Sequence, residues 1–530
     1  MKTRDFTQWT QVEAAHLLNR AGFGGTPEAV RQLHALGPEA AVDSLLAGGK
    51  PASEPPPKWA NAEAFGEKMQ ELKILKRQLV GGKFAQNKRA TESMEENDAM
   101  MEKSMDGAGS ESARAEARMD LQRKYRRIAK DQGVELTHWW FRRMLTGEFP
   151  LQEKMTLFWH GHFATSMEKV REPYFMFLQN VLFRKHALGD FAALLKGIVR
   201  DPAMMIYLDV AQSRKQMPNE NFAREVMELF TLGEGNYTEA DIKSAAQAFT
   251  GLRLSKDSGE VRFTSQQHAA GEKKMFGQSG DFGPEETVDL LLKQEACARF
   301  LARKLLRQFV NDAPTDAEIA EFATVLRAEN YHMGASLRRL FLSQDFYARK
   351  NIRAEIKSPV EFLVQLAKQL ELSEMPEFLV IGAMRELGQQ LFLPPNVAGW
   401  PGGSAWITTN TLFTRYNIAG LLTRSMDPDY SVPRIAGNTY KKNKRRDKGK
   451  RSQPGMAAPD YARLVPESLR QDAEKLLDDL VFRFFQFPLR PEDRETFLAH
   501  ARKESDGGVS DIEIARLVHL MTSTPFYQLT

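Results

Sequence analysis

Cysteine, long apolar runs and a strong overall charge are all scarce in this 530-residue sequence. The single cysteine, Cys297, excludes an internal disulfide, and its surrounding text EACARFLARKLL predicts a buried position on a helix. No apolar run approaches the roughly 20 residues of a membrane-spanning helix, and the first residues, MKTRDFTQWT, lack the apolar core of a secretory signal. We therefore expect no transmembrane segment and a cytoplasmic protein.

The mildly basic net charge comes from one short segment. Residues 441–451, KKNKRRDKGKR, carry eight Lys or Arg against one Asp, a local charge of +7 within a total of +4, which leaves −3 for the rest. An enzyme that acts on nucleic acid is expected to spread Lys and Arg over one face, interleaved with aromatic residues, and this sequence does not. We expect no nucleic-acid partner. The basic segment indicates a solvated loop or, as an alternative, a contact with an acidic polymer or anionic membrane.

Most of the chain carries helix signals, and one stretch carries a hairpin signal. Proline follows a capping side chain at Thr26, Asp201 and Ser358. Capping boxes are predicted for three pairs: Thr238 with Asp241, Thr315 with Glu318, and Ser358 with Glu361. Two alternating segments flank a turn in residues 252–265, which predicts a β-hairpin. The predicted fold class is all-α (mainly α), with irregular multi-helix modules and one small β-hairpin.

Composition divides the chain into five predicted segments. The arm within the second has apolar residues at helical spacing on two stretches, with a turn expected at residues 107–112. The segments are an N-terminal helical part of the main domain (1–50), a linker and charged helical arm (51–131), the main helical domain (132–425), a disordered basic loop (426–458) and a C-terminal helical module (459–530).

Polar residues that suit chemistry are concentrated in residues 150–251, beginning with the text FWHGHF. His160 and His162 are two residues apart, so they share a face only if the segment is extended. In that geometry the pair is a usable chelate for a divalent metal. The alternative is two structural histidines packed between Trp159 and Phe163.

A helix predicted to begin after Asn219 supplies the candidate carboxylate. Glu225 lies at the flank of the apolar stripe of NENFAREVMELF, where a carboxylate needs a cation, a histidine or a metal as partner. We assign Glu225 as the third metal ligand and, with Arg224, as a candidate catalytic residue. The alternatives are a buried ion pair of Glu225 with Arg184 or Arg200, and an exposed salt-bridge ladder that includes Arg224.

Residues 393–417, LPPNVAGWPGGSAWITTNTLFTRYN, predict a rigid irregular loop. Trp400 and Trp406, with Asn396 and Asn410, are candidate binding residues that would stack on a sugar ring and hydrogen-bond its edge. The alternative is that the two tryptophans fill the interface between helical modules.

Several long motifs resemble a bacterial family, the domain of unknown function 1800, over nearly the whole chain. They include HLLNRAGFG, EKMTLFWHGHFATS, PNENFAREVMELFTLGEGNYTEADI, IKSPVEFL, LFLPPNVAGWPGGSAWI and LMTSTPFYQ. Ala269 departs from the Asp that this family has after the histidine of HAAGEKKMFG. The resemblance implies no settled activity. It does imply, as a partner, a twin-arginine-exported protein encoded nearby, and a periplasmic or exported location with that partner as the alternative to the cytoplasm.

The sequence shows no serine-nucleophile elbow, and Cys297 has no nearby histidine. Two functions stay open. The first is a metal-assisted enzyme, a hydrolase or oxidoreductase, that acts on an envelope-associated polymer or small molecule. The second is a non-catalytic helical binding or partner protein of an exported or envelope protein.

Overall fold

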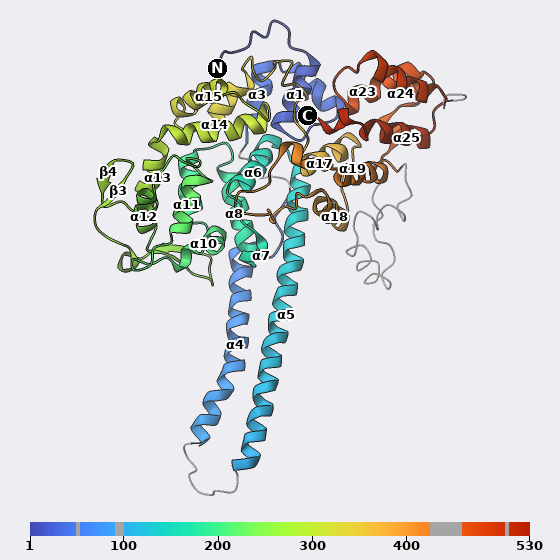
Figure 1. The fold of residues 1–530 in the computed structure, drawn as a ribbon. Helices are drawn as coiled ribbons and strands as arrows, with labels where there is room; N and C mark the ends of the chain where they lie inside the picture. Colours follow the sequence, from blue (N-terminus) through green and yellow to red (C-terminus); the bar gives the residue numbers. More distant parts are fainter. Residues whose placement is uncertain (49–53, 91–99, 425–457, 504–507) are drawn as a thin grey trace.

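The computed structural model describes residues 1–48, 54–90, 100–424, 458–503 and 508–530 (Figure 1). Helices dominate these residues, and the strands form two small antiparallel hairpins, which confirms the mainly α fold. None of the helices in the described ranges is both long enough and apolar enough to cross a membrane. Most of the predicted basic loop, residues 426–457, lies outside the described residues.

Among the described residues, twelve helices between residues 11 and 341 build one hydrophobic core. Its helices are α1 (Gln11–Ala21), α2 (Pro27–Ala35), α3 (Pro38–Leu46), α6 (Pro150–His162), α9 (Phe191–Val199), α10 (Pro202–Tyr207), α11 (Glu220–Glu228), α12 (Glu239–Ala248), α13 (Pro284–Lys293), α14 (Glu295–Phe309), α15 (Asp316–Ala328) and α16 (Met333–Phe341). Cys297 is buried on α14, as its text predicts.

A second core joins the remaining helices. They are α5 (Met100–Thr146), α7 (Met167–Val170), α8 (Pro173–Lys185), α17 (Pro359–Gln369), α18 (Glu377–Leu387), α19 (Thr409–Leu422), α21 (Tyr461–Leu464), α22 (Glu467–Arg470), α23 (Ala473–Phe484), α24 (Pro491–Lys503) and α25 (Asp511–Thr522). Helix α6 touches both cores, because Met155 and Trp159 pack into the first and Leu157 into the second. Its other residues are therefore held at the boundary between the cores.

The helix starts follow local side-chain chemistry. Thr26, Asp201 and Ser358 each accept a hydrogen bond from a backbone N–H of the first turn, and each is followed by proline. All three predicted capping boxes form, at α12, α15 and α17. These interactions satisfy backbone donors that a helix leaves unpaired at its N-terminus, which is why they could be predicted from short stretches of sequence.

The predicted β-hairpin forms, and a second one lies beside it in the chain. Strand β1 (Leu252–Leu254) pairs antiparallel with β2 (Val261–Phe263), inside the predicted range. The second hairpin, β3 (Lys273–Met275) with β4 (Gln278–Gly280), was not predicted. Its two turn residues, Phe276 and Gly277, both have positive φ, so a phenylalanine occupies a position where Asn or Asp is the usual signal.

The charged arm is two helices, α4 (Ala62–Ala90) and α5, that project side by side from the body (Figure 1). The turn expected at residues 107–112 is wrong, because α5 runs through this range. Its Gly and Ser residues are flanked by Ala, Met, Glu and Arg, which favour helix strongly enough to offset about 1 kcal/mol per glycine. The connection between the two helices falls at residues 91–99, outside the described residues.

Candidate functional site

The two histidines of the FWHGHF motif lie on a continuous helix rather than on an extended segment. Helix α6 ends at His162, so side chains two residues apart point in different directions. The Nε2 of His160 accepts a hydrogen bond of 2.9 Å from the backbone N–H of Phe392. In His162, Nε2 donates to the carbonyl of Phe230 at 3.0 Å, and Nδ1 lies 3.2 Å from the Nζ of Lys304. Each ring therefore has its own structural partners.

Both imidazoles are held in the neutral form. Burial lowers the pKa of His160 to about 3. Burial also lowers the pKa of His162 well below its usual value, and the charge of Lys304 lowers it further. The rings pack among aromatic side chains, with His162 edge-on to Trp159 at 5.5 Å between ring centroids and to Phe163 at 4.4 Å. This environment matches the structural alternative for the pair.

The predicted metal set is not assembled. Nowhere in the described parts of the chain do three or more His, Cys, Asp or Glu side chains form a group that could hold a metal ion, so His160, His162 and Glu225 do not meet as a chelate. The physical reason is the helical backbone of α6, which separates the two rings that an extended segment would place together.

Glu225 and Arg224 lie on α11, half-buried and away from the cavity described below. Burial, followed by the charge of Glu228, raises the pKa of Glu225. Arg224 forms two hydrogen bonds of 2.9 Å to Glu239, a residue of the next helix, in place of the predicted ladder within α11. No observation gives these two residues a catalytic role.

The predicted ion-pair partners of Glu225 are engaged elsewhere. Arg184 donates to buried Glu153 at 2.7 Å, and Arg143 donates to the same carboxylate at 3.0 Å. Arg200 donates to Glu285 at 2.8 Å. The ion-pair alternative for Glu225 is therefore wrong for both arginines, because other carboxylates already occupy their guanidinium groups.

The loop that contains Trp400 and Trp406, called the tryptophan loop below, packs on the last turn of α6 through a contact between two glycines. Gly399 has φ +83°, and a Cβ placed on it would lie 2.2 Å from the carbonyl oxygen of Gly161. Only glycine permits this approach. The contact brings the half-buried ring of Trp400 to 5.4 Å from the ring of His160, and the loop then continues to buried Trp406 in η3 (Gly403–Trp406).

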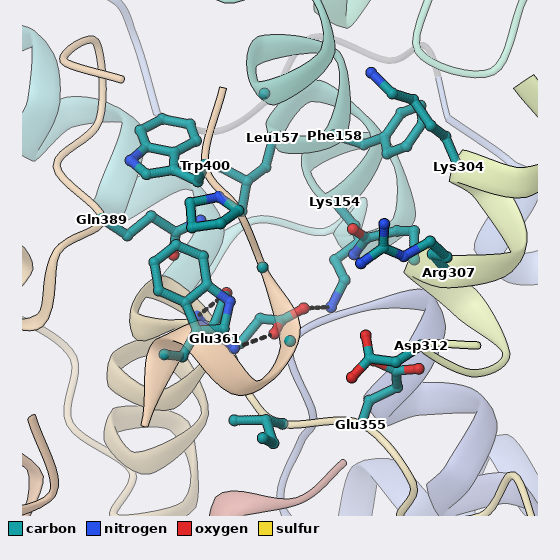
Figure 2. Close-up of a pocket in the computed structure, with 18 of the residues that line it drawn as sticks. Lys154, Leu157, Phe158, Lys304, Arg307, Asp312, Glu355, Glu361, Gln389 and Trp400 are labelled. Carbon is teal, nitrogen blue, oxygen red and sulfur yellow. Dashed lines mark hydrogen bonds and ion pairs between the residues drawn. The ribbon is translucent and has the colours of Figure 1, made fainter. Parts of the chain in front are cut away.

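A polar cavity of about 360 Å³ opens between α6, α14, the start of α17 and this loop (Figure 2). Its lining combines two tryptophans with an unusual number of charged groups. The charged residues are Arg20, Lys154, Lys304, Arg307, Asp312, Glu355 and Glu361, and the uncharged ones include Leu157, Phe158, His162, Ser358, Gln389, Trp400 and Trp406.

A buried ion pair fixes one wall of the cavity. The Nζ of Lys154 binds the carboxylate of Glu361 and also donates to the carbonyl of Gly22 at 2.9 Å. Burial alone would raise the pKa of Glu361, but Lys154 and the hydrogen bonds from Ser358 lower it below its usual value. Figure 2 shows this chain of contacts from Lys154 through Glu361 to the cap of α17. All of its polar partners lie within the protein.

A second group of charges on the cavity wall is incompletely paired. Arg20 Nη2 lies 3.5 Å from Glu355 Oε1, and neither of these buried atoms has a hydrogen-bond partner among the described residues. The carboxyl group of Asp312 lies close to that of Glu355 (Figure 2). Unpaired buried polar atoms cost free energy unless a ligand or water completes them. Arg20 and Glu355 both line the cavity, so water or a ligand in the cavity is the available source of such a partner.

The two neighbouring carboxyl groups have different surroundings. Glu355 is buried, whereas Asp312 is half-buried. Burial raises the pKa of Glu355 to about 7, with Arg20 opposing this shift and Asp312 adding to it. A carboxyl group with a pKa raised to about 7 can donate a proton near neutral pH, and a more exposed carboxyl group beside it can act as the base. The pair can therefore supply an acid and a base at one place.

Two cations of α14, Lys304 and Arg307, lie on the side of the cavity that faces Trp400, near Asp312 (Figure 2). Lys304 is half-buried, and burial followed by the charge of Arg307 lowers its pKa to about 8. Arg307 is exposed. Together they give this side of the cavity a positive potential suited to an anionic group.

Some of the predicted binding residues line the cavity and others do not. Trp400 and Trp406 are in its wall. Asn396 and Asn410 are exposed and outside it, and the side chain of Asn396 accepts a hydrogen bond from the backbone of Ala398. The predicted sugar-edge contacts by the two asparagines are not supported, because one of these amides stabilises its own turn.

The charged residues of the cavity were not identified from the sequence. They come from distant segments, and no local pattern links Arg20, Asp312 and Glu355. A partial signal was present, since Arg20 and Glu361 fall inside the motifs HLLNRAGFG and IKSPVEFL. Neither motif by itself indicates that its charged residue reaches a cavity.

The family model described as Protein of unknown function (DUF1800) matches residues 16–529. Neither a curated protein nor a solved structure matches the chain. The match spans nearly the whole chain, so the protein belongs to this family.

Proposed function

We propose that this member of the family is an acid–base enzyme that hydrolyses a sugar-containing substrate, with Glu355 and Asp312 as its catalytic pair. One observation carries the proposal: two adjacent carboxyl groups, one buried and one half-buried, line a cavity whose wall also contains two tryptophans. A metal-assisted reaction would need a group of metal-ligating side chains, and the described residues contain none. The proposal therefore assigns the proton transfers to the two carboxyl groups.

The different surroundings of the two carboxyl groups assign their roles. Glu355, with its pKa raised to about 7, is protonated in about half of the molecules at pH 7 and donates this proton to the oxygen of the leaving group. Asp312 is more accessible to solvent and accepts a proton from the attacking water. The bond to the leaving oxygen breaks, the water oxygen forms the new bond, and the pair returns to its starting state after one proton exchange with solvent.

The remaining wall residues suggest the class of substrate. Trp400 presents a half-buried ring, the type of surface on which the apolar face of a sugar stacks. Lys304 and Arg307 favour an anionic substituent on that sugar, such as a carboxylate. Arg20 Nη2 and Glu355 Oε1 gain their missing partners when a hydroxyl group or water binds between them.

The test measures hydrolysis of neutral and acidic oligosaccharides by the full-length protein and by two variants, Glu355→Gln and Asp312→Asn. General acid or base catalysis contributes about 10²- to 10⁴-fold, so each variant should lose at least about 100-fold in kcat. Glu28→Gln, an exposed carboxylate paired with Arg31, is the matched control and should be unchanged.

Two results would contradict the proposal. One is a wild-type protein that hydrolyses none of these substrates although they bind in the cavity, as detected by protection of Trp400 fluorescence from an external quencher. The other is a hydrolytic activity that survives both carboxyl substitutions.

The alternative, a binding or partner protein, is favoured by a separate observation at the base of the arm. A second cavity there has an apolar lining and contains no carboxyl pair of the kind described above. The two functions use different surfaces and are compatible.

A further inference from the structure

A groove of about 1200 Å³ runs along the base of the arm, where α4 and α5 lie side by side next to α7 (Figure 1). It is independent of the cavity near Trp400, and no lining residue is shared. Its lining residues on α5 are Arg118, Leu121, Gln122, Tyr125, Arg126, Ala129, Lys130, Gly133, Val134 and Thr137. The other walls come from α4, α7, α18 and the segment that follows α18, with Lys68, Leu72, Lys76, Met167, Glu168, Arg171, Glu172, Ile381, Gln390 and Leu393.

The α5 residues in this lining form one continuous face of the helix. Their spacing alternates between three residues and one, which repeats the i, i+3, i+4 pattern of a helix surface that packs on another helix. From residue 118 to residue 137 the face extends roughly 28 Å at 1.5 Å per residue. Helix α4 covers this face only in part, because a groove remains between the two helices.

The centre of the face is apolar and adaptable. Leu121, Tyr125, Ala129 and Val134 are half-buried, and the flexible side chain of Met167 packs against Gly133. The hydroxyl of Tyr125 is buried and has no hydrogen-bond partner in the part of the chain that the structure describes. The lining thus has the composition of a surface on which another helix can pack.

The edges of the groove are positively charged. Lys76, Arg118, Arg126 and Lys130 have no ion pair among the described residues, whereas Lys68 is bound to Glu172 with both oxygens at 2.9 Å. Glu168 and Glu172 are the acidic residues of the lining. Together with Arg171, these four cations border an apolar face, which favours an occupant that is apolar on one side and acidic on its flanks.

We propose that this groove binds an amphipathic helix of another protein, with apolar residues at i, i+3, i+4 and i+7 and with Asp or Glu on both flanks. The bound helix lies along α5 and completes a three-helix bundle with α4 and α5. The length of the face favours a helix over a lipid, because one acyl chain spans about half of the roughly 30 Å hydrocarbon core, whereas the face continues for roughly 28 Å.

The probe is a fluorescein-labelled peptide of about 18 residues with leucine on one helical face and glutamate on both flanks. Binding to the full-length protein is followed by fluorescence anisotropy. We expect saturable binding that weakens as salt rises, because the flanking contacts are between charges at the surface. A peptide with lysine at every glutamate position should bind at least 10-fold more weakly.

Two groove variants locate the binding site. Arg126→Gln with Lys130→Gln removes two flanking cations, and Leu121→Gln removes apolar surface; each should weaken binding of the glutamate peptide at least fivefold. The matched control, Arg123→Gln with Arg127→Gln, removes the same charge from exposed positions of α5 outside the lining and should bind as the wild type does.

Several outcomes would overturn the proposal. Equal binding of the glutamate and lysine peptides would show that the flanking cations do not contribute to recognition of an acidic peptide. Equal binding by wild type and groove variants would place the peptide elsewhere. Binding to phosphatidylglycerol vesicles that the groove variants abolish, without peptide binding, would make the occupant a lipid. Self-association in sedimentation velocity that the groove variants abolish would make it a second copy of this chain.

Discussion

The two cavities of this protein differ in whether their charged side chains are buried and paired or exposed and unpaired. In the cavity near Trp400, Lys154 and Glu361 are buried and bound to each other, and Arg20 and Glu355 are buried and only partly paired. In the groove on the arm, Arg126 and Lys130 are exposed and have no ion pair among the described residues. A buried charge needs a partner within the fold or in a ligand, whereas an exposed cation is solvated by water.

Because of this difference, the two sets of charges should have different roles, in the stability of the fold at the first cavity and in recognition of a partner at the groove. The buried charges in the cavity near Trp400 are coupled to the folding free energy, because removing one partner leaves the other buried and unpaired. Charges at the groove contribute little to folding and act only when a partner of opposite charge arrives. The comparison therefore predicts large stability effects at the first cavity and almost none at the second.

The largest effect is expected at the buried ion pair. Lys154→Met leaves the carboxylate of Glu361 buried without its cation, so the free energy of unfolding should fall by about 3–5 kcal/mol. Urea denaturation followed by circular dichroism measures this change. Adding Glu361→Gln should recover part of the loss, because the amide is neutral and its oxygen can still accept from the backbone N–H of Ser358. A loss below about 1 kcal/mol in the single variant would contradict the account.

A smaller effect is expected where the tryptophan loop meets α6. Gly399→Ala adds a Cβ that would stand 2.2 Å from the Gly161 carbonyl oxygen at a positive φ, so a loss of about 2–4 kcal/mol and a displaced Trp400 are expected. Gly402→Ala is the matched control: its φ of +75° carries a similar strain, but nothing lies within 4 Å of the added Cβ. With φ +75° and ψ −176°, Gly402 lies in a region that other residues almost never adopt, so its substitution should cost about 1–3 kcal/mol, less than Gly399→Ala. Equal losses would show that loop docking adds nothing beyond backbone strain.

The pH dependence of stability should carry opposite contributions from His160 and Glu355. The pKa of His160 is lowered from 6.5 to about 3, so the unfolded chain binds more protons in that range and stability falls as pH falls from 6.5. The pKa of Glu355 is raised from 4.5 to about 7, so the folded protein binds more protons there and stability falls as pH rises from 4.5 to 7.

Denaturation between pH 4 and pH 8 separates these contributions. His160→Gln keeps an acceptor for the Phe392 N–H and should reduce the acid-side slope by about one proton. Glu355→Gln should remove the opposite slope. An unchanged slope in either variant would contradict the corresponding pKa shift.

The smallest stability effect is expected at the groove. Arg126→Gln and Lys130→Gln should each change the free energy of unfolding by less than about 0.5 kcal/mol, since these exposed side chains have no ion pair among the described residues. Urea denaturation beside Lys154→Met provides the direct comparison. A fall of several kcal/mol in the free energy of unfolding would show that the groove cations stabilise the fold. It would then contradict the proposed difference between the two cavities.

Local chemistry made much of the fold predictable. Two kinds of local feature were predicted correctly, the helix caps at Thr26, Asp201 and Ser358 and the β1–β2 hairpin. Both depend on residues a few positions apart, so a short stretch of sequence contains every residue that takes part. The hairpin β3–β4 was missed because its turn places Phe276 at positive φ, a conformation that its residue type does not signal.

The candidate site could be predicted only in part, because most of it is made by distant contacts. Trp400 and Trp406 were identified from the composition of their loop. The metal hypothesis for His160 and His162 required an extended backbone, but α6 continues through both residues, and Gly161 does not break the helix. The carbonyl oxygen of Gly161 instead receives the close approach of Gly399. The proximity of Asp312 and Glu355 depends on how the segment after α14 and the segment before α17 are brought together by tertiary packing.

The most direct test of the central claim is the protonation of Glu355 in the intact protein. Difference infrared spectroscopy with ¹³C-labelled glutamate, recorded between pH 5 and pH 9, separates glutamate carboxyl groups from Asp201, whose pKa burial also raises to about 7. The account predicts a glutamate carboxyl band that titrates near pH 7, disappears in Glu355→Gln, shifts to lower pH in Asp312→Asn and is unchanged in Glu28→Gln. A glutamate band near pH 7 that survives in Glu355→Gln, or no such band in the wild type, would contradict the assignment of Glu355 as the acid.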